Sequence, residues 1–129
     1  MKLSHFYVLL SFLLVWSVCE RNLSGPSVDA EGLQITAGES AFSLYNGTDQ
    51  ELRLFLVEQQ VAAVIKWSPY CLPSGLILQP DERRSVDYQD VYGYKKDCTV
   101  IIYWWTCIEV DGERTPGDIQ STTLPAGPK

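Results

Sequence analysis

The chain has 129 residues, with 10 Lys or Arg, 16 Asp or Glu and one His, which give a formal net charge of −6. This length suits one modest domain, and the acidic balance argues against nucleic acid as a partner because like charges repel. The single histidine, His5, lies near the N-terminus. The remainder of the chain therefore lacks the residues for Ser-His or Cys-His catalysis, cupredoxin-type copper and His-containing zinc sites, and we expect no metal or cofactor.

Residues 1–19 are predicted to be a signal peptide, so we expect a secreted or cell-envelope protein. The run FYVLLSFLLVWSV, residues 6–18, contains thirteen residues and no charge. That is the length of a secretory apolar region, and it is short for a helix that spans a bilayer.

Cys19 directly follows this apolar run, at the position where a bacterial lipoprotein carries its lipid-modified cysteine. Trp16 and Val18 depart from the residues of a good lipobox, and ordinary cleavage after Ser17 or after Cys19 is the alternative. We favour lipidation because residues 20–31 suit a polar tether that follows an anchor. A lipid on Cys19 would then be the only link to the membrane.

Residues 32–125 are predicted to form a single all-β domain. Runs rich in Val, Ile, Leu, Tyr and Trp recur at short intervals, separated by Gly, Pro, Asn and Asp. About seven or eight such strands predict a small antiparallel β-sandwich, immunoglobulin-like or cupredoxin-like, with a small closed barrel as the second choice.

The predicted strands alternate with turn-forming residues along the chain. In residues 41–45, Phe42 and Leu44 share one face, and residues 89–97 are predicted to be a loop or a brief 3₁₀ turn before the turn at 111–114. The strand candidates, besides the one described next, are GLQIT (32–36), AFSLY (41–45), ELRLFLVE (51–58), VAAVIKW (61–67), LILQ (76–79), RRSVDY (83–88) and DIQSTTL (118–124).

The stretch CTVIIYWWTC, residues 98–107, is predicted to be the central strand and to continue to Val110. Its nine steps span roughly 30 Å as a strand, whereas the Cα atoms of a disulfide lie within about 7 Å. No Gly, Pro, Asn or Asp interrupts it, so Cys98 and Cys107 are not expected to pair. We instead predict a Cys71–Cys98 bridge with Cys107 as a buried free thiol, and Cys71–Cys107 is the rival pairing.

Aromatic residues offer two candidate recognition surfaces. Tyr103 and Trp105 share one face of the central strand, which is either covered or exposed as a platform for a sugar or a partner protein. The loop residues Tyr88, Tyr92 and Tyr94 either tuck under the edge of the sandwich or form an aromatic-lined surface. In the second case they are joined by Trp67 and Tyr70.

Carboxylates are the only other candidates for chemistry, and nothing in the sequence places two of them opposite each other. Asn22 and Asn46 lie in glycosylation sequons, which matter only in a eukaryotic source. The available carboxylates are Asp87, Asp90, Asp97, Glu109, Asp111 and Glu113.

The motifs YNGTDQELRLFLVE (45–58), VIKWSPYC (64–71) and VIIYWW (100–105) occur in this order, with LQPDE and GY between the last two. Together they resemble uncharacterised bacterial secreted or lipoprotein β-domains, which pair an Asn-x-Thr-Asp turn with a later Tyr-Trp-Trp strand. The resemblance covers roughly residues 41–108 and implies no particular activity.

We therefore expect an exported cell-envelope β-sandwich that acts as a binding or structural module and not as an enzyme. Its expected partner is an unknown protein or glycan of the cell envelope. One alternative is a carbohydrate-binding domain that uses exposed Tyr and Trp side chains. A small hydrolase based on carboxylates alone is less favoured.

Overall fold

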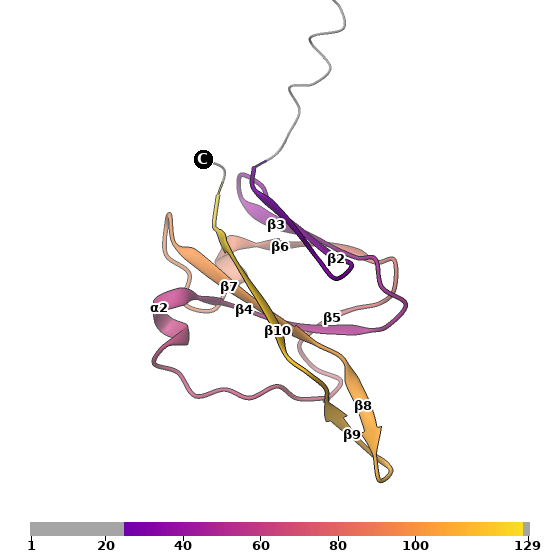
Figure 1. The fold of residues 1–129 in the computed structure, drawn as a ribbon. Coiled ribbons are helices and arrows are strands. Elements are labelled where there is room, and N and C mark those ends of the chain that lie inside the picture. The colour runs from indigo at the N-terminus through magenta and orange to yellow at the C-terminus, as the bar shows by residue number, and fades with distance from the viewer. Residues whose placement is uncertain (1–24, 128–129) are drawn as a thin grey trace, which may run out of the picture.

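The computed structural model describes residues 25–127, which form two four-stranded antiparallel sheets and a separate hairpin (Figure 1). In spatial order, sheet A contains β1 (Ser27–Ala30), β2 (Leu33–Ala37), β3 (Ala41–Asn46) and β6 (Arg83–Asp87). Sheet B contains β10 (Gln120–Pro125), β7 (Thr99–Trp105), β4 (Leu52–Glu58) and β5 (Leu76–Leu78). The hairpin contains β8 (Cys107–Val110) and β9 (Glu113–Pro116), and the short helices are α2 (Gln59–Ala62) and the 3₁₀ turn η2 (Tyr88–Asp90). The prediction of an all-β sandwich is confirmed.

The core lies between the two sheets and follows the alternation of the strands. Phe42 and Leu44 of β3 are fully buried on one face, as predicted. They meet Leu54 and Leu56 of β4 in one apolar cluster, which Ile102 of β7 joins. Burial of such side chains contributes about 1.5–3 kcal/mol each.

Seven of the strands follow the order of immunoglobulin-like sandwiches. In sheet A, β2, β3 and β6 occupy the positions of strands A, B and E, while in sheet B, β10, β7, β4 and β5 occupy those of G, F, C and C′. The outer strand β1 has no counterpart in that order, and no strand of sheet A within residues 25–127 occupies the position of D. Every strand pair within the sheets is antiparallel.

The predicted turn after β3 is confirmed, and it buries Asn46 completely. The Asn46 amide nitrogen donates to the carbonyl oxygens of Gln50 at 2.7 Å and of Leu78 at 3.1 Å, and its side-chain oxygen accepts from the Thr48 amide at 2.9 Å. A glycan could not be attached to this nitrogen in the folded protein without loss of at least one of the two donated hydrogen bonds, because it would replace one of the two hydrogens.

Three sequence predictions are wrong in detail. Residues 27–30, assigned to the tether, form β1, which pairs with β2 through the Glu31-Gly32 turn, where both residues have positive φ. Residues 61–67 form no strand, because α2 ends at Ala62 and the chain then continues as a loop. The described residues contain ten strands, compared with the seven or eight that were predicted.

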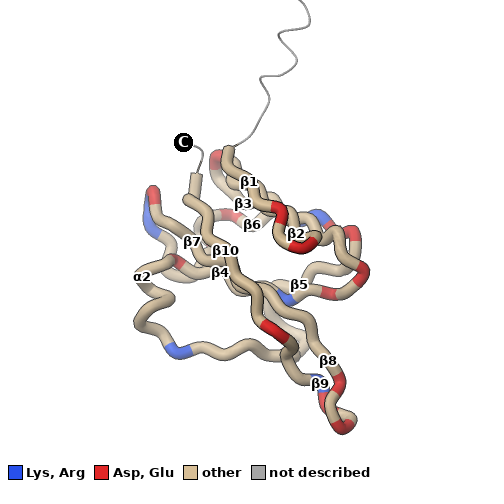
Figure 2. The backbone as a smooth tube through the Cα atoms, viewed as in Figure 1, with Lys and Arg blue, Asp and Glu red and all other residues tan. Residues whose placement is uncertain are grey.

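The third error concerns the predicted central strand, which does not continue to Val110. β7 ends at Trp105, and Thr106 redirects the chain into β8, which pairs only with β9. The Asp111-Gly112 turn of this hairpin has φ values of 54° and 81°, the pattern of a type I′ turn, and it carries acidic residues away from the sandwich (Figure 2). The predicted turn at 111–114 is thus confirmed.

The segments that bear on export are only partly described. The predicted signal peptide and Cys19 lie outside residues 25–127, as does Asn22. Within the described part of the chain, no helix has the length and apolar character needed to cross a membrane.

Candidate functional site

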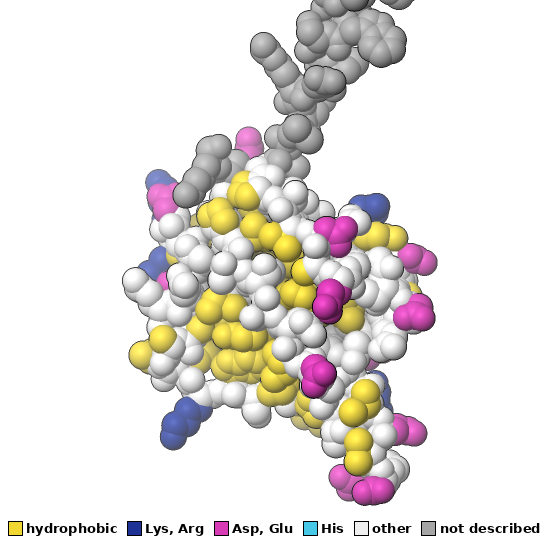
Figure 3. All heavy atoms as spheres, viewed as in Figure 1, with side chains coloured by type: hydrophobic (Ala, Val, Ile, Leu, Met, Phe, Trp, Pro, Cys, Tyr) yellow, Lys and Arg dark blue, Asp and Glu magenta, His cyan; other side chains and the backbone are white. Residues whose placement is uncertain are grey.

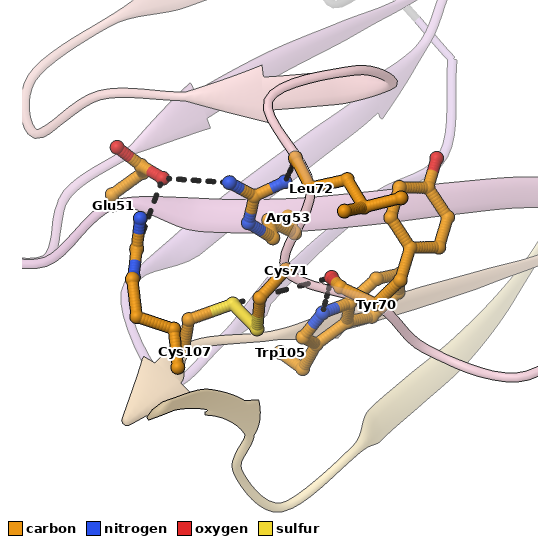
Figure 4. Close-up of a disulfide and its surroundings, with 8 residues drawn as sticks. Glu51, Arg53, Tyr70, Cys71, Leu72, Trp105 and Cys107 are labelled. Atoms are coloured by element: carbon orange, nitrogen blue, oxygen red, sulfur yellow. Dashed lines mark hydrogen bonds and ion pairs between the residues drawn. A yellow bond between two sulfur atoms is a disulfide. The ribbon is translucent and has the colours of Figure 1, made fainter. Parts of the chain in front are cut away.

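Cys71 forms a disulfide with Cys107, and their Cα atoms are 6.0 Å apart (Figure 4). The predicted Cys71–Cys98 bridge is therefore wrong and the rival pairing is correct. Cys98 is a free, half-buried thiol that packs against the core. The physical reason is that Cys98 and Cys107 lie at opposite ends of β7, and Cys71 lies at the Cys107 end. The expectation that Cys98 and Cys107 do not pair is confirmed.

Residues 63–75, which we call the strap, connect α2 to β5 and cross the outer face of sheet B. Besides the disulfide, two hydrogen bonds fasten it to the sheet (Figure 4). The indole Nε1 of Trp105 donates to the carbonyl oxygen of Tyr70 at 3.0 Å. The guanidinium of Arg53 donates to the carbonyl oxygen of Leu72. The strap is therefore held at three consecutive residues.

Arg53 lies buried beneath the strap, which is unusual for a charged residue on a sheet face. The second terminal nitrogen of Arg53 lies 3.4 Å from a carboxylate oxygen of Glu51, and the same oxygen lies 3.8 Å from a guanidinium nitrogen of Arg114 in β9. The Nε of Arg53 has no hydrogen-bond partner. The Arg53 guanidinium thus binds the strap directly and is linked to the hairpin only through Glu51, and its burial is compensated only in part.

The strap covers an aromatic cluster, which we define as Phe55, Trp67, Tyr70, Tyr103 and Trp105. The ring centroid of Trp67 lies 4.9 Å from that of Phe55, 4.7 Å from that of Tyr103 and 6.0 Å from that of Trp105. Trp105 is only 2% exposed. The strap thus covers Trp105, while Tyr103 on the same face is half-buried, so the two side chains do not form the exposed platform that was considered.

The three loop tyrosines do not form one surface. Tyr88 is buried, with its ring 4.9 Å from that of Phe42 in an edge-on arrangement and its hydroxyl donating to the carbonyl oxygen of Gly38. Burial raises the pKa of Tyr88. Tyr94 stacks against Tyr88 at 6.1 Å. Tyr92 instead remains 56% exposed on the other side of the loop.

Tyr92 lines a cavity of about 430 Å³ between β4, β5 and β6, which we call the edge cavity. Tyr70, which is 41% exposed, lines it as well. Of the five residues predicted as a recognition surface, only Tyr92 lines the edge cavity. Tyr70, which lines it too, was considered in the sequence as a residue that could join the loop tyrosines. The remaining lining residues are Leu54, Phe55, Leu56, Gly75, Leu76, Arg84, Ser85, Val86 and Asp90.

Gly75 fits the edge cavity because it has no side chain. Its φ is +97°, and a Cβ atom there would lie 2.4 Å from the hydroxyl oxygen of Tyr70. The Tyr70 side chain therefore rests directly on the backbone where the strap enters β5. The disulfide at the next residue, Cys71, fixes the backbone of Tyr70, so the strap forms one wall of the cavity.

A second cavity of about 460 Å³ lies beside the base of the β8–β9 hairpin. Glu31, Asp49 and Asp118 line it together with Trp104 and Ile108. None of the six carboxylates considered from the sequence lies there. Within residues 25–127, no three His, Cys, Asp or Glu side chains form a group that could hold a metal ion.

Glu58 is a buried carboxylate at the end of β4, where it caps α2. Its Oε2 accepts a hydrogen bond from the Val61 amide at 2.8 Å. Hydrogen bonds from the backbone of Gln60 and then of Val61 hold the pKa of Glu58 below its ordinary value, although burial opposes them. The cap orients the chain where it leaves sheet B and enters the strap.

We expect Glu58→Gln to lower the stability of the protein at neutral pH but not in acid. Because the folded pKa is lowered, the contribution of the carboxylate is fully present above the ordinary pKa of 4.5. It is lost as the pH falls through the folded pKa. Urea titrations at neutral pH and below about pH 3 measure this. An equal difference between wild type and variant at both pH values would contradict it.

No protein-family model matches this chain, and no curated protein or solved structure matches it either. Its function is therefore inferred from the geometry of its own cavities and surfaces.

Proposed function

We propose that this chain is an exported protein of the cell envelope whose β-sandwich acts as a binding module through the edge cavity. The observation that carries the proposal is the pair of exposed tyrosines, Tyr70 and Tyr92, in a cavity with apolar lining. Concave sites with aromatic walls and few polar groups are typical of ligand binding. Export is supported by the signal-like residues 1–19 and by the Cys71–Cys107 disulfide, since disulfides persist in oxidising compartments.

The lining of the edge cavity favours binding without catalysis. It holds one carboxylate, that of Asp90, together with Arg84 and Ser85, and it has no Cys or His. Hydrolysis by carboxylates alone uses two carboxyl groups that face each other. The area that a ligand can cover comes instead from the exposed Tyr70 and Tyr92 and from the half-buried Leu76 and Val86.

We expect Tyr92→Ala to weaken ligand binding by about tenfold or more, as for an exposed aromatic residue at the centre of an interface. The fold should persist, because only the backbone of Tyr92 bonds to β4. Binding of the variant and of wild type can be compared on a synthetic glycan array and on an array of heptapeptides that alternate apolar and polar residues.

The matched control for this experiment is Val110→Ala, which removes an exposed apolar side chain from the distant β8–β9 hairpin. This control should bind the array probes as wild type does. The proposal is contradicted if no probe binds, or if every bound probe binds Tyr92→Ala as tightly as wild type.

A further inference from the structure

The edge cavity lies beside a strand edge that has no neighbour. Sheet A ends at β6, whose far side carries no strand in residues 25–127. On the facing side of the cavity, β4 is paired first with β5, a strand of three residues, and then with the backbone of Tyr92. The Tyr92 amide donates to the carbonyl oxygen of Leu56 at 3.1 Å, and its carbonyl oxygen accepts from the Glu58 amide at 2.9 Å. β5 is itself the edge strand of sheet B but has only three residues, so β6, with five residues, offers the longer free edge beside the cavity.

The hydrogen bonds of β6 show which of its backbone groups are free. The Tyr88 amide donates to Ser40, and the Asn46 amide donates to Glu82, each at 3.0 Å. These pairs share one register with β3, so the even-numbered residues of β6 bond to β3. The amide and carbonyl groups of Arg83, Ser85 and Asp87 then point to the free side.

Ser85 also lines the edge cavity, so free backbone groups and apolar side chains occur together there. The apolar lining comes from Leu54 and Leu56 of β4, Leu76 of β5 and Val86 of β6. A strand added to β6 would present every second side chain to this apolar lining, because side chains alternate along a strand. A glycan has no row of backbone amides that could pair with the free backbone groups of β6, so a peptide strand matches this edge better.

Charge further defines the segment that would fit. β6 begins with two arginines, Arg83 and Arg84, and both are exposed. The guanidinium of Arg84 is paired with Glu82, but that of Arg83 lies over the ring of Tyr45 at 4.3 Å and forms no salt bridge within the described residues. An acidic residue at one end of the added strand would complement Arg83.

We propose that the edge cavity binds an extended segment of a partner protein, which adds to β6 as a fifth strand of sheet A and carries apolar side chains with an acidic residue beside Arg83. This inference rests on the proposed function of the edge cavity and names its ligand class. The geometry matches the addition of peptide strands to exposed sheet edges. The charges of Arg83, Arg84 and Asp87 would also limit pairing with unsuitable strands.

The test uses the blocked heptapeptide Glu-Val-Thr-Val-Thr-Val-Glu, whose Val and Glu side chains lie on opposite faces of a strand, and two versions of it, N-methylated at the odd or at the even residues. Binding is measured by NMR titration of the full mature chain. We expect the parent peptide to shift the Ser85 amide resonance and to slow its hydrogen exchange. One N-methylated version should bind about tenfold more weakly, because only one set of peptide amides faces β6. The other should bind like the parent.

Ser85→Pro provides the matched change in the protein. It removes the free amide and spares the bonds between β6 and β3, and proline is tolerated on an edge strand at such positions. We expect this variant to remain folded by circular dichroism and to lose peptide binding. If it unfolds, the pair of N-methylated peptides still decides the question.

Four results would overturn the inference. Equal binding of both N-methylated peptides would show that side chains alone make the contact. Tyr92-dependent binding of cellohexaose without binding of the peptide would leave the proposed function standing and refute the peptide ligand. Protection of the Ser85 amide that rises with protein concentration alone would assign the edge to a second copy of the chain. Binding of neither peptide nor cellohexaose would refute both proposals.

Discussion

The double variant Cys71→Ser/Cys107→Ser is expected to lower the free energy of unfolding by about 3–4 kcal/mol. The disulfide closes a loop with a sequence separation of 36 residues, and the chain-entropy relation assigns about that value to such a loop. The loss should exceed what the covalent link alone provides if the strap then leaves the outer face, because the aromatic cluster becomes accessible. Urea titration with and without reductant measures the change in free energy.

Cys98→Ser is the control for this experiment. Cys98 is half-buried and unpaired, so its substitution should change the free energy of unfolding by less than about 1 kcal/mol. The double variant also leaves Cys98 without another cysteine within residues 25–127 with which it could form an incorrect bridge. A Cys98→Ser variant that is as unstable as the double variant would contradict the assigned pairing.

Trp67→Ala is expected to lower the free energy of unfolding by about 2 kcal/mol, less than truncation of a large aromatic side chain in a core, because Trp67 is half-buried. Trp67 is the one strap residue whose ring meets three rings of sheet B. Its removal should also expose Trp105, which would raise the quenching of tryptophan emission by acrylamide. Urea titration and quenching measure the two effects.

Lys66→Ala serves as the matched control, because Lys66 adjoins Trp67 on the strap and its side chain is exposed. We expect it to change stability by less than about 0.5 kcal/mol. Equal losses of stability from Lys66→Ala and Trp67→Ala would contradict this account, because the effect of Trp67→Ala would then not come from the aromatic cluster.

The fold was predictable where local pattern and tertiary structure agree. The alternation of Phe42 and Leu44 shows directly which face of β3 is buried, and the Asp-Gly pair at 111–112 specifies a type I′ turn. Residues 61–67 were not predictable, because Ala62-Ala63 suits a helix while the following Val, Ile and Trp suit a strand. The end of β7 before Thr106 was not predictable either, because no Gly or Pro at this point indicates that the strand stops.

The candidate site was only partly predictable, because it depends on where a loop crosses a sheet. Tyr103 and Trp105 were correctly placed on one face of β7, but no periodicity in the sequence indicates that residues 63–75 cover that face. Arg53 offered one signal, since a charged residue between Leu52 and Leu54 in a buried strand requires a polar partner. That partner is the carbonyl oxygen of Leu72 in the strap.

The cysteine pairing was predicted wrongly for a related reason, because the end of the central strand was not predictable. A continuous strand through residue 110 would have carried Cys107 away from Cys71, and the Cys71–Cys98 bridge then appeared preferable. The end of β7 at Trp105 brings Cys107 back to the strap.

On the face of the molecule shown in Figure 3, apolar side chains gather over β4 and β7, where the strap leaves part of the outer face uncovered.

The position of the strap over sheet B is the claim on which the aromatic cluster and the wall of the edge cavity both depend. Mass spectrometry of an unreduced proteolytic digest, after alkylation of free thiols, tests it most directly. We expect one cross-linked species that joins the peptides of Cys71 and Cys107, with Cys98 recovered as an alkylated thiol. A cross-link between Cys71 and Cys98 would contradict the strap, its cluster and the cavity that it lines.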